Sequence, residues 1–147
     1  RRLFKQRYVC VFRQGHPLAD NPISMAQYKS LSHVGVTSAN TGHSEVDAWL
    51  QRKGIERQIQ LHVPHFVAVG HILQSSDLIA TVPERFAQRV TRPFALTTRT
   101  LPLAVDGSAI HQFWHARLHK DPGHQWLRTL VAQCFGDGSK TSAEQIT

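Results

Sequence analysis

Short apolar segments alternate with helical ones along most of the chain, and this alternation limits the possible folds more than any other feature. Four segments have the apolar, β-branched or alternating pattern of strands and stop at turn-forming residues, namely 8–12, 33–37, 59–63 and 77–82. Each of the last three strand-like segments is followed by apolar residues at helical spacing, in 43–53, 66–73 and 84–90. Because strands that alternate with helices form parallel sheets through right-handed crossovers, the sequence predicts an α/β architecture.

Residues that favour helix ends mark where the helices begin and stop. Asn21 and Pro22 predict the start of a further helix, and Pro83 is placed at the first helical position of another. Gly54 stands where the helix at 43–53 is expected to end, since glycine accepts the left-handed conformation found at helix C-termini.

The pattern changes after Pro93. Residues 96–104 are predicted to be extended, and 112–118 fits a strand or a helix by spacing alone. Asp121, a strong N-cap, and Pro122 predict that a helix begins directly afterwards. Two helices would be cramped there, so we predict a strand over 112–118.

The composition is that of an ordinary globular domain. Apolar residues make up 41% and charged residues 18% of the sequence, and no apolar run approaches the roughly eighteen residues that a membrane span needs. The run at 8–12 is too short for a signal peptide. Cys10 and Cys134 are far apart in the sequence, so two reduced thiols are expected. We therefore expect a cytoplasmic domain.

The formal net charge of +7 suggests an acidic partner. The chain before Asp20 carries only basic charges, whereas basic and acidic residues are mixed farther on. A nucleic-acid groove needs Lys and Arg interleaved with aromatic residues on one surface, and the sequence has no such spacing. Direct nucleic-acid binding by this chain is therefore not predicted.

The first candidate binding segment lies between a predicted strand and a predicted helix. Its polar side chains include Ser38, Asn40, Thr41 and His43. In open α/β sheets, ligands bind beyond the carboxyl ends of the strands, where helix N-termini supply free N–H groups and partial positive charge. These side chains are suited to holding an anion. The same residue types also cap helices in proteins that bind nothing there.

The second candidate is the pair His65 and Phe66, which occupies the equivalent position after the strand at 59–63. The pair suits an aromatic carboxylate, because the ring can stack on it while the imidazole donates a hydrogen bond. The alternative is structural, with Phe66 in the core and His65 as a surface cap.

Ten histidines raise the question of a metal or acid/base site. His111, His115 and His119 stand four residues apart, and in a strand this spacing separates neighbouring imidazoles by about 13 Å, too far to share an ion. The sequence contains no nucleophile elbow, zinc-protease, P-loop or dinucleotide-binding motif. We predict no catalytic residue, no metal and no cofactor.

Several stretches of the sequence resemble LysR-type transcriptional regulators. They are 3–18, 77–85, and the closing runs FWHAR at 113–117 and DPGHQWLR at 121–128. The closing runs are the most specific, and they are similar to the ending of the subgroup that contains the nodulation, naphthalene/salicylate and nitroaromatic-degradation regulators. The resemblance extends from Leu3 to about Phe135.

The resemblance implies a periplasmic-binding-protein-like (type 2) α/β effector domain with two lobes. One lobe, 15–93, would be complete, and the other would be truncated. Residues 1–14 and 94–135 would form the partial lobe with the crossover segments, and 136–147 a mobile polar tail. The DNA-binding domain would precede Arg1 and is absent from this chain.

The resemblance also implies a ligand sensor that is not an enzyme. Carried onto this sequence, one wall of the interlobe cleft falls on Ser38, Asn40, Thr41, His43, His65 and Phe66. Near Leu101 and Pro102 this chain lacks a polar side chain that a further family contact would use, which leaves the effector's identity open. A small effector, aromatic-acid-like in character, would favour one interlobe angle and so reorient partner subunits of a homo-oligomer that carry the DNA-binding domains.

Other functions share this architecture. A solute-binding protein of a transporter would carry a secretion signal and no DNA-binding module. An α/β enzyme with histidine-based chemistry would need an activated nucleophile or a metal. A dimerisation module is compatible with the regulator, since such regulators pair through their effector domains.

Overall fold

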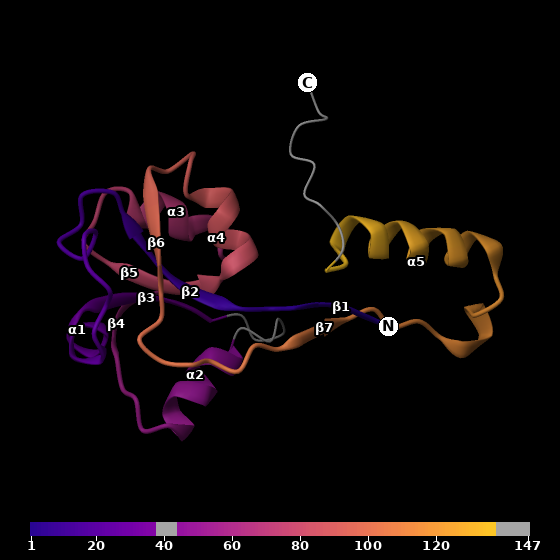
Figure 1. Ribbon diagram of the computed structural model, residues 1–147, viewed down its shortest axis with the longest axis horizontal. Helices are drawn as coiled ribbons and strands as arrows, with labels where there is room; N and C mark the ends of the chain where they lie inside the picture. Colours follow the sequence, from indigo (N-terminus) through magenta and orange to yellow (C-terminus); the bar gives the residue numbers. More distant parts are fainter. Residues whose placement is uncertain (38–43, 138–147) are drawn as a thin grey trace. The chain divides into compact units, whose positions relative to one another are not determined.

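The computed structural model describes residues 1–37 and 44–137. The chain divides into two compact units, of which the larger is Arg7–Asp106. The smaller joins Arg1–Gln6 to the residues from Gly107 onward. Figure 1 labels the elements of both units. Apart from its first two residues, the predicted tail at 136–147 lies outside the described residues.

The larger unit contains a five-stranded sheet in the order β4-β3-β5-β2-β6. Its strands are β2 (Tyr8–Arg13), β3 (Ser32–Val36), β4 (Gln58–Val63), β5 (Ile79–Pro83) and β6 (Leu96–Thr100). β3 runs parallel to β4 and β5, whereas β2 runs antiparallel to β5 and β6. The predicted parallel sheet is thus wrong for β2. Alternating strands and helices show how consecutive elements connect, but they do not give the direction of β2, because its neighbours in the sheet are far along the chain.

Four helices accompany these strands in the described part of the larger unit. They are α1 (Met25–Ser30), α2 (Ser44–Arg52), α3 (Val67–Leu73) and α4 (Glu84–Val90). The predicted start of α1 at Asn21 is wrong, because Ser24 and Gln27 form a capping box that fixes the start at Met25. Gly54 lies just beyond α2 with a φ of 65°, as predicted for the end of that helix.

Neighbouring residues of the central strands enter two different cores, because successive side chains of a strand point to opposite faces. Val11 belongs to the core that includes residues of α3 and α4. Cys10 and Phe12 belong to the other, which includes Tyr28 of α1 and Leu50 of α2. Helices therefore cover both faces of the sheet, in the layered α/β arrangement (Figure 1).

The smaller unit pairs β1 (Arg2–Lys5) antiparallel with β7 (Ala109–His111) and continues into η1 (Ala116–Leu118) and α5 (Pro122–Phe135). Asp121 caps α5 by accepting a hydrogen bond from the His124 N–H at 2.8 Å, as the sequence predicts. The predicted strand over 112–118 is wrong. Residues 112–115 have no regular structure, and η1 follows, with the Arg128 guanidinium donating to the Leu118 and His119 carbonyls at its end.

The compact units divide the chain at other positions than the lobes that the family resemblance implies, and those lobe boundaries stay a prediction. Those boundaries grouped 1–14 with 94–135 as one partial lobe. In the structure β2 and β6 belong to the larger unit, because both strands are hydrogen bonded within its sheet. None of the helices in the described part of the chain is both long and apolar enough to cross a bilayer.

Candidate ligand-binding site

The carboxyl ends of β3 and β4 lie side by side. The two strands finish at the paired residues Val36 and Val63, and the Thr37 N–H then donates to the Val63 carbonyl at 3.0 Å. The two strands therefore end at neighbouring points of the sheet.

The same edge of the sheet also carries ends of the three other strands. β5 is parallel to β3, so its carboxyl end at Pro83 lies there. Tyr8, at the start of β2, pairs with Pro83, and Thr100, at the end of β6, pairs with Val9. A ligand bound at this edge would therefore adjoin the strands by which the chain enters and leaves the larger unit.

Four of the six predicted site residues lie outside the described residues. They are Ser38, Asn40, Thr41 and His43. The structure describes Thr37 before them, which is exposed, and the helix α2 that begins at Ser44.

The other two predicted residues lie at the start of α3 and differ in burial. His65 is exposed, whereas Phe66 is half-buried. Phe66 packs against the core on the α3 and α4 side, with its ring centroid 5.2 Å from that of Phe86. Phe66 is also the N-cap residue of α3, so His65 stands one position outside the helix. Much of the Phe66 ring therefore packs in the core, as the structural alternative predicts, while His65 faces solvent.

Val67 is a further candidate that the sequence analysis missed. It is the first residue of α3, next to His65, and is 78% exposed. A valine at helical spacing normally indicates a core position, so the sequence gives no signal of this exposure. An exposed apolar side chain beside an imidazole is suited to an aromatic or otherwise apolar ligand that carries one polar group.

A buried polar cluster lies on the α1 and α2 side of the sheet. The Tyr28 hydroxyl is 2.7 Å from the Thr81 hydroxyl oxygen and accepts a hydrogen bond from Arg57 Nη1 at 3.4 Å. Arg57 also forms an ion pair with Asp47. Sequence reasoning missed this cluster because charged residues in a helix and a loop are typical of exposed positions.

Burial changes the pKa of groups in and beside this cluster. It raises the pKa of the Cys10 thiol to about 12 and also raises the pKa of Tyr28 above its ordinary value. It lowers the pKa of His33 to about 4, although a hydrogen bond between His33 Nε2 and the Tyr28 carbonyl opposes the change. These pKa shifts mean that the three side chains stay neutral, as core residues do. The Cys10 thiol is therefore not activated as a nucleophile.

Within residues 1–37 and 44–137, no group of three or more His, Cys, Asp or Glu side chains is placed to hold a metal ion. The spacing argument for His115 and His119 no longer applies, since 112–118 is not a strand. Instead, each uses its Nδ1 in a local bond. His115 accepts from the Arg117 N–H, and His119 accepts from the indole N–H of Trp114.

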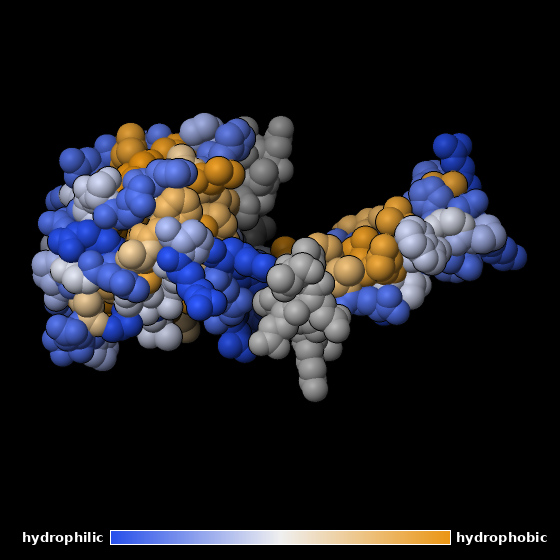
Figure 2. Space-filling model, turned by 90° about the horizontal axis from the view of Figure 1, so that it is seen from above, coloured by the Kyte–Doolittle hydropathy of each residue, from blue (hydrophilic) through white to orange (hydrophobic). Residues whose placement is uncertain are grey.

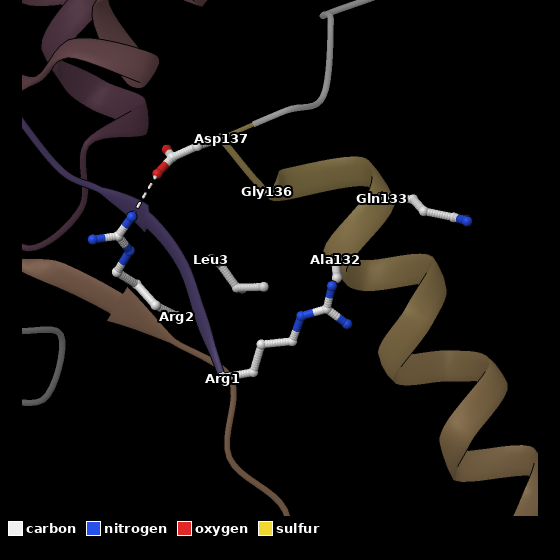
Figure 3. Close-up of a pocket in the computed structure, with 7 residues that line it drawn as sticks. All are labelled: Arg1, Arg2, Leu3, Ala132, Gln133, Gly136 and Asp137. Carbon is white, nitrogen blue, oxygen red and sulfur yellow. Dashed lines mark ion pairs between the residues drawn. The ribbon is translucent and has the colours of Figure 1, made fainter.

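A separate hollow of about 480 Å³ belongs to the smaller unit and contains none of the predicted site residues (Figure 3). Arg1, Arg2 and Leu3 line one side. The end of α5 and the residues after it line the other, where Arg2 forms an exposed ion pair with Asp137 at 3.6 Å.

The chain is similar to known regulators. The family model described as LysR substrate binding domain matches residues 1–135. The chain is 54% identical to the HTH-type transcriptional activator NagR of Ralstonia sp and 47% identical to the HTH-type transcriptional activator NahR of Pseudomonas putida, in each case over 93% of this chain and 46% of the relative. It thus spans about half the length of these relatives.

Solved structures share the fold. A putative transcriptional regulator from Vibrio parahaemolyticus superposes with a TM-score of 0.77 and 26% identity, over 90% of this chain and 62% of that one. The regulatory domain of MexT from Pseudomonas aeruginosa gives 0.77 and 24%, over 90% and 65%. These matches confirm the predicted effector-domain fold. Because the family model covers nearly all of the described residues, this chain belongs to the LysR substrate-binding-domain family.

Proposed function

We propose that this chain is the effector-binding part of a cytoplasmic LysR-type transcription regulator, and that its ligand binds beyond the carboxyl ends of β3 and β4. The observation that carries the proposal is the pairing of Val36 with Val63, continued by the hydrogen bond from Thr37. This pairing puts the ends of both strands at one edge of the sheet, and open α/β sheets bind ligands beyond such an edge. The names of the two relatives, both transcriptional activators, support a regulatory role.

The ligand is proposed to be a small aromatic acid. Ser38, Asn40, Thr41 and His43 would supply hydroxyl, amide and imidazole groups from the segment before α2. At the start of α3, His65 would donate a hydrogen bond to the carboxylate, and Val67 would contact the ring. Phe66 would offer the part of its ring that the core leaves uncovered.

A sensor fits the described chemistry better than an enzyme does. The buried thiol and histidine have pKa values that favour their neutral forms, and we assign no catalytic residue. A ligand that binds both lobes would favour one interlobe angle, and a homo-oligomer would pass that change to DNA-binding domains outside this chain.

Isothermal titration calorimetry on the purified protein at its natural length, with salicylate and 2-nitrobenzoate as probes, tests this proposal. His65→Ala should weaken binding about tenfold, the loss expected for one hydrogen bond to a charged group. His71→Ala, at the other end of α3, is the matched control and should bind like the wild type. Equal affinities in the wild type and both variants would exclude His65 from the site, and failure of the wild type to bind either acid would overturn the aromatic-acid proposal.

A further inference from the structure

We infer that Phe86 is a positioning residue for the proposed ligand-binding residues at the start of α3. This inference rests on the proposed function, since it concerns the affinity of that same site. Phe86 lies in the first turn of α4, and it acts through Phe66, whose ring it contacts. It does not itself bind the ligand.

The first turn of α3 lacks the polar bonds that usually fix where a helix begins. Phe66 is the N-cap residue of α3, and its side chain makes no capping hydrogen bond. In this helix, which the structure describes in full, no acidic residue stands in the first turn. Side-chain caps normally satisfy the free N–H groups of such a turn and hold the backbone around them. The position of the turn therefore depends on how the Phe66 ring packs.

The Phe66 ring packs against Phe86 of the neighbouring helix. The two ring centroids lie 5.2 Å apart and the ring planes are tilted by 46°, a separation and tilt at which aromatic rings attract each other. Both side chains are half-buried against the core on the α3 and α4 side. Because a phenylalanine ring has few rotatable bonds, fixing the ring also restricts the backbone at Phe66.

Phe86 is well placed to fix that ring, because α4 is itself anchored. The Glu84 N–H, at the start of α4, donates to the Arg7 carbonyl at 2.9 Å. Pro83 before it is buried, and Ala87, directly after Phe86, is 1% exposed and belongs to the same core. The core and the backbone before β2 therefore set the position of Phe86.

The residues on either side of Phe66 are the proposed ligand contacts His65 and Val67. Both are exposed, so core packing holds neither side chain, and their positions follow the backbone at Phe66. A binding group must be held to a fraction of an ångström, which requires supporting residues whose own side chains are locked by packing. Phe86 supplies this support from a helix that carries none of the proposed ligand contacts.

A second phenylalanine allows positioning to be separated from general packing. Phe94 is also half-buried, and it packs against the same core and against α3. Its contacts lie farther along that helix, where its ring is 4.6 Å from the His71 ring and would meet a Cβ placed on Gly70. Loss of either ring would loosen α3, but only loss of the Phe86 ring would release the first turn.

The experiment measures salicylate affinity by calorimetry on the protein at its natural length, with thermal unfolding by circular dichroism to show that each variant is folded. Phe86→Leu keeps an apolar side chain, removes the ring and should weaken binding about fivefold. Phe86→Tyr keeps the ring and should bind within about twofold of the wild type. Phe94→Leu, the matched control, should lower the Tm as Phe86→Leu does but leave the affinity unchanged.

A double-mutant cycle with His65→Ala shows whether Phe86 acts through the residues beside Phe66. In the His65→Ala background, Phe86→Leu should weaken binding by at most about twofold, because the main group that it positions is absent. A loss of about fivefold in that background would overturn the inference. Equal losses of affinity in Phe86→Leu and Phe94→Leu, or wild-type affinity in Phe86→Leu, would overturn it as well.

These outcomes also separate the inference from the proposed function. If Phe86→Leu binds like the wild type while His65→Ala binds more weakly, the inference fails and the proposed function stands. If the wild type does not bind salicylate, both fail.

Discussion

The two compact units differ in how their apolar side chains are used. In the larger unit, eighteen apolar side chains from Cys10 to Leu96 are buried in two cores. In the smaller unit no described residue is fully buried, and α5 leaves Trp126 66% and Leu127 47% exposed. Apolar surface of this unit is visible in Figure 2. The larger unit is therefore held together mainly by apolar burial, and the smaller one by directional bonds.

Those directional bonds come from the motif that most resembles the family. The Arg128 guanidinium lies 4.5 Å from the Trp114 ring centroid and also binds two backbone carbonyls. Asp121 caps the helix that carries Arg128. The most specific part of the sequence thus has a structural role, whereas the proposed ligand-binding residues occupy positions with weak sequence signals.

The largest expected effect is the cost of truncating a core ring in the larger unit. Phe12 is completely buried, so Phe12→Ala should lower the free energy of unfolding of this chain by about 3–5 kcal/mol. Trp126→Ala in α5 should cost well under about 1 kcal/mol, because most of that side chain already contacts water. Urea denaturation followed by far-UV circular dichroism measures both. Similar costs for the two variants would contradict the contrast between the units.

Replacing one glycine by alanine in each unit should change stability less, and in opposite directions. A Cβ on Gly70 in α3 would stand 2.5 Å from the Phe94 ring, so Gly70→Ala should destabilise the chain by about 1–3 kcal/mol. At Gly123 in α5 a Cβ would lie 3.4 Å from an oxygen of the Asp121 carboxylate, at ordinary contact distance. Gly123→Ala should therefore stabilise, by up to about 1 kcal/mol, through helix propensity. Thermal unfolding checks both signs, and a stabilising Gly70→Ala would show that Phe94 moves aside easily.

Most helices and strands of the larger unit could be predicted, because the residue spacing that indicates them lies within each element. Period-two and helical spacing place β3, β4 and α2, and the parallel pairing of β3 with β4 then places the candidate site at one edge. The direction of β2 could not be predicted, because it depends on pairing with strands far along the chain. The prediction of a strand over 112–118 was wrong for a related reason. The end of this stretch is bound by Arg128 of the following helix, which donates to the Leu118 carbonyl.

The sequence pattern predicted which edge of the sheet carries the candidate site. It predicted the side chains near that edge less well. His65 was predicted from its position between a strand and a helix, beside an aromatic ring, and the structure leaves it exposed, so its role stays a prediction. Val67 was not predicted, because an exposed valine and a buried one look alike in a sequence. The Arg57 and Asp47 pair was missed for the opposite reason, since burial of a charged pair leaves no local pattern.

A contrast of similar size concerns a histidine in each unit and depends on pH. His33 is completely buried, and its Nδ1 has no hydrogen-bond partner among the described residues. Burial disfavours the charged imidazolium, which is why the pKa of His33 falls to about 4. An unfolded histidine titrates near 6.5, so between that pH and about 4 only the unfolded chain binds the proton.

The stability of the larger unit should therefore decrease as the pH falls through this window, by at most about 1.4 kcal/mol per pH unit from His33 alone. Urea denaturation at pH 7 and pH 5 measures the difference. His33→Gln, which can still donate to the Tyr28 carbonyl, should reduce the loss of stability at pH 5 relative to the wild type. His111→Gln, at an exposed position of the smaller unit, is the matched control and should leave the loss unchanged. If both variants lose as much stability as the wild type, other groups carry the pH dependence, and burial of His33 neutral in the core contributes nothing measurable to it.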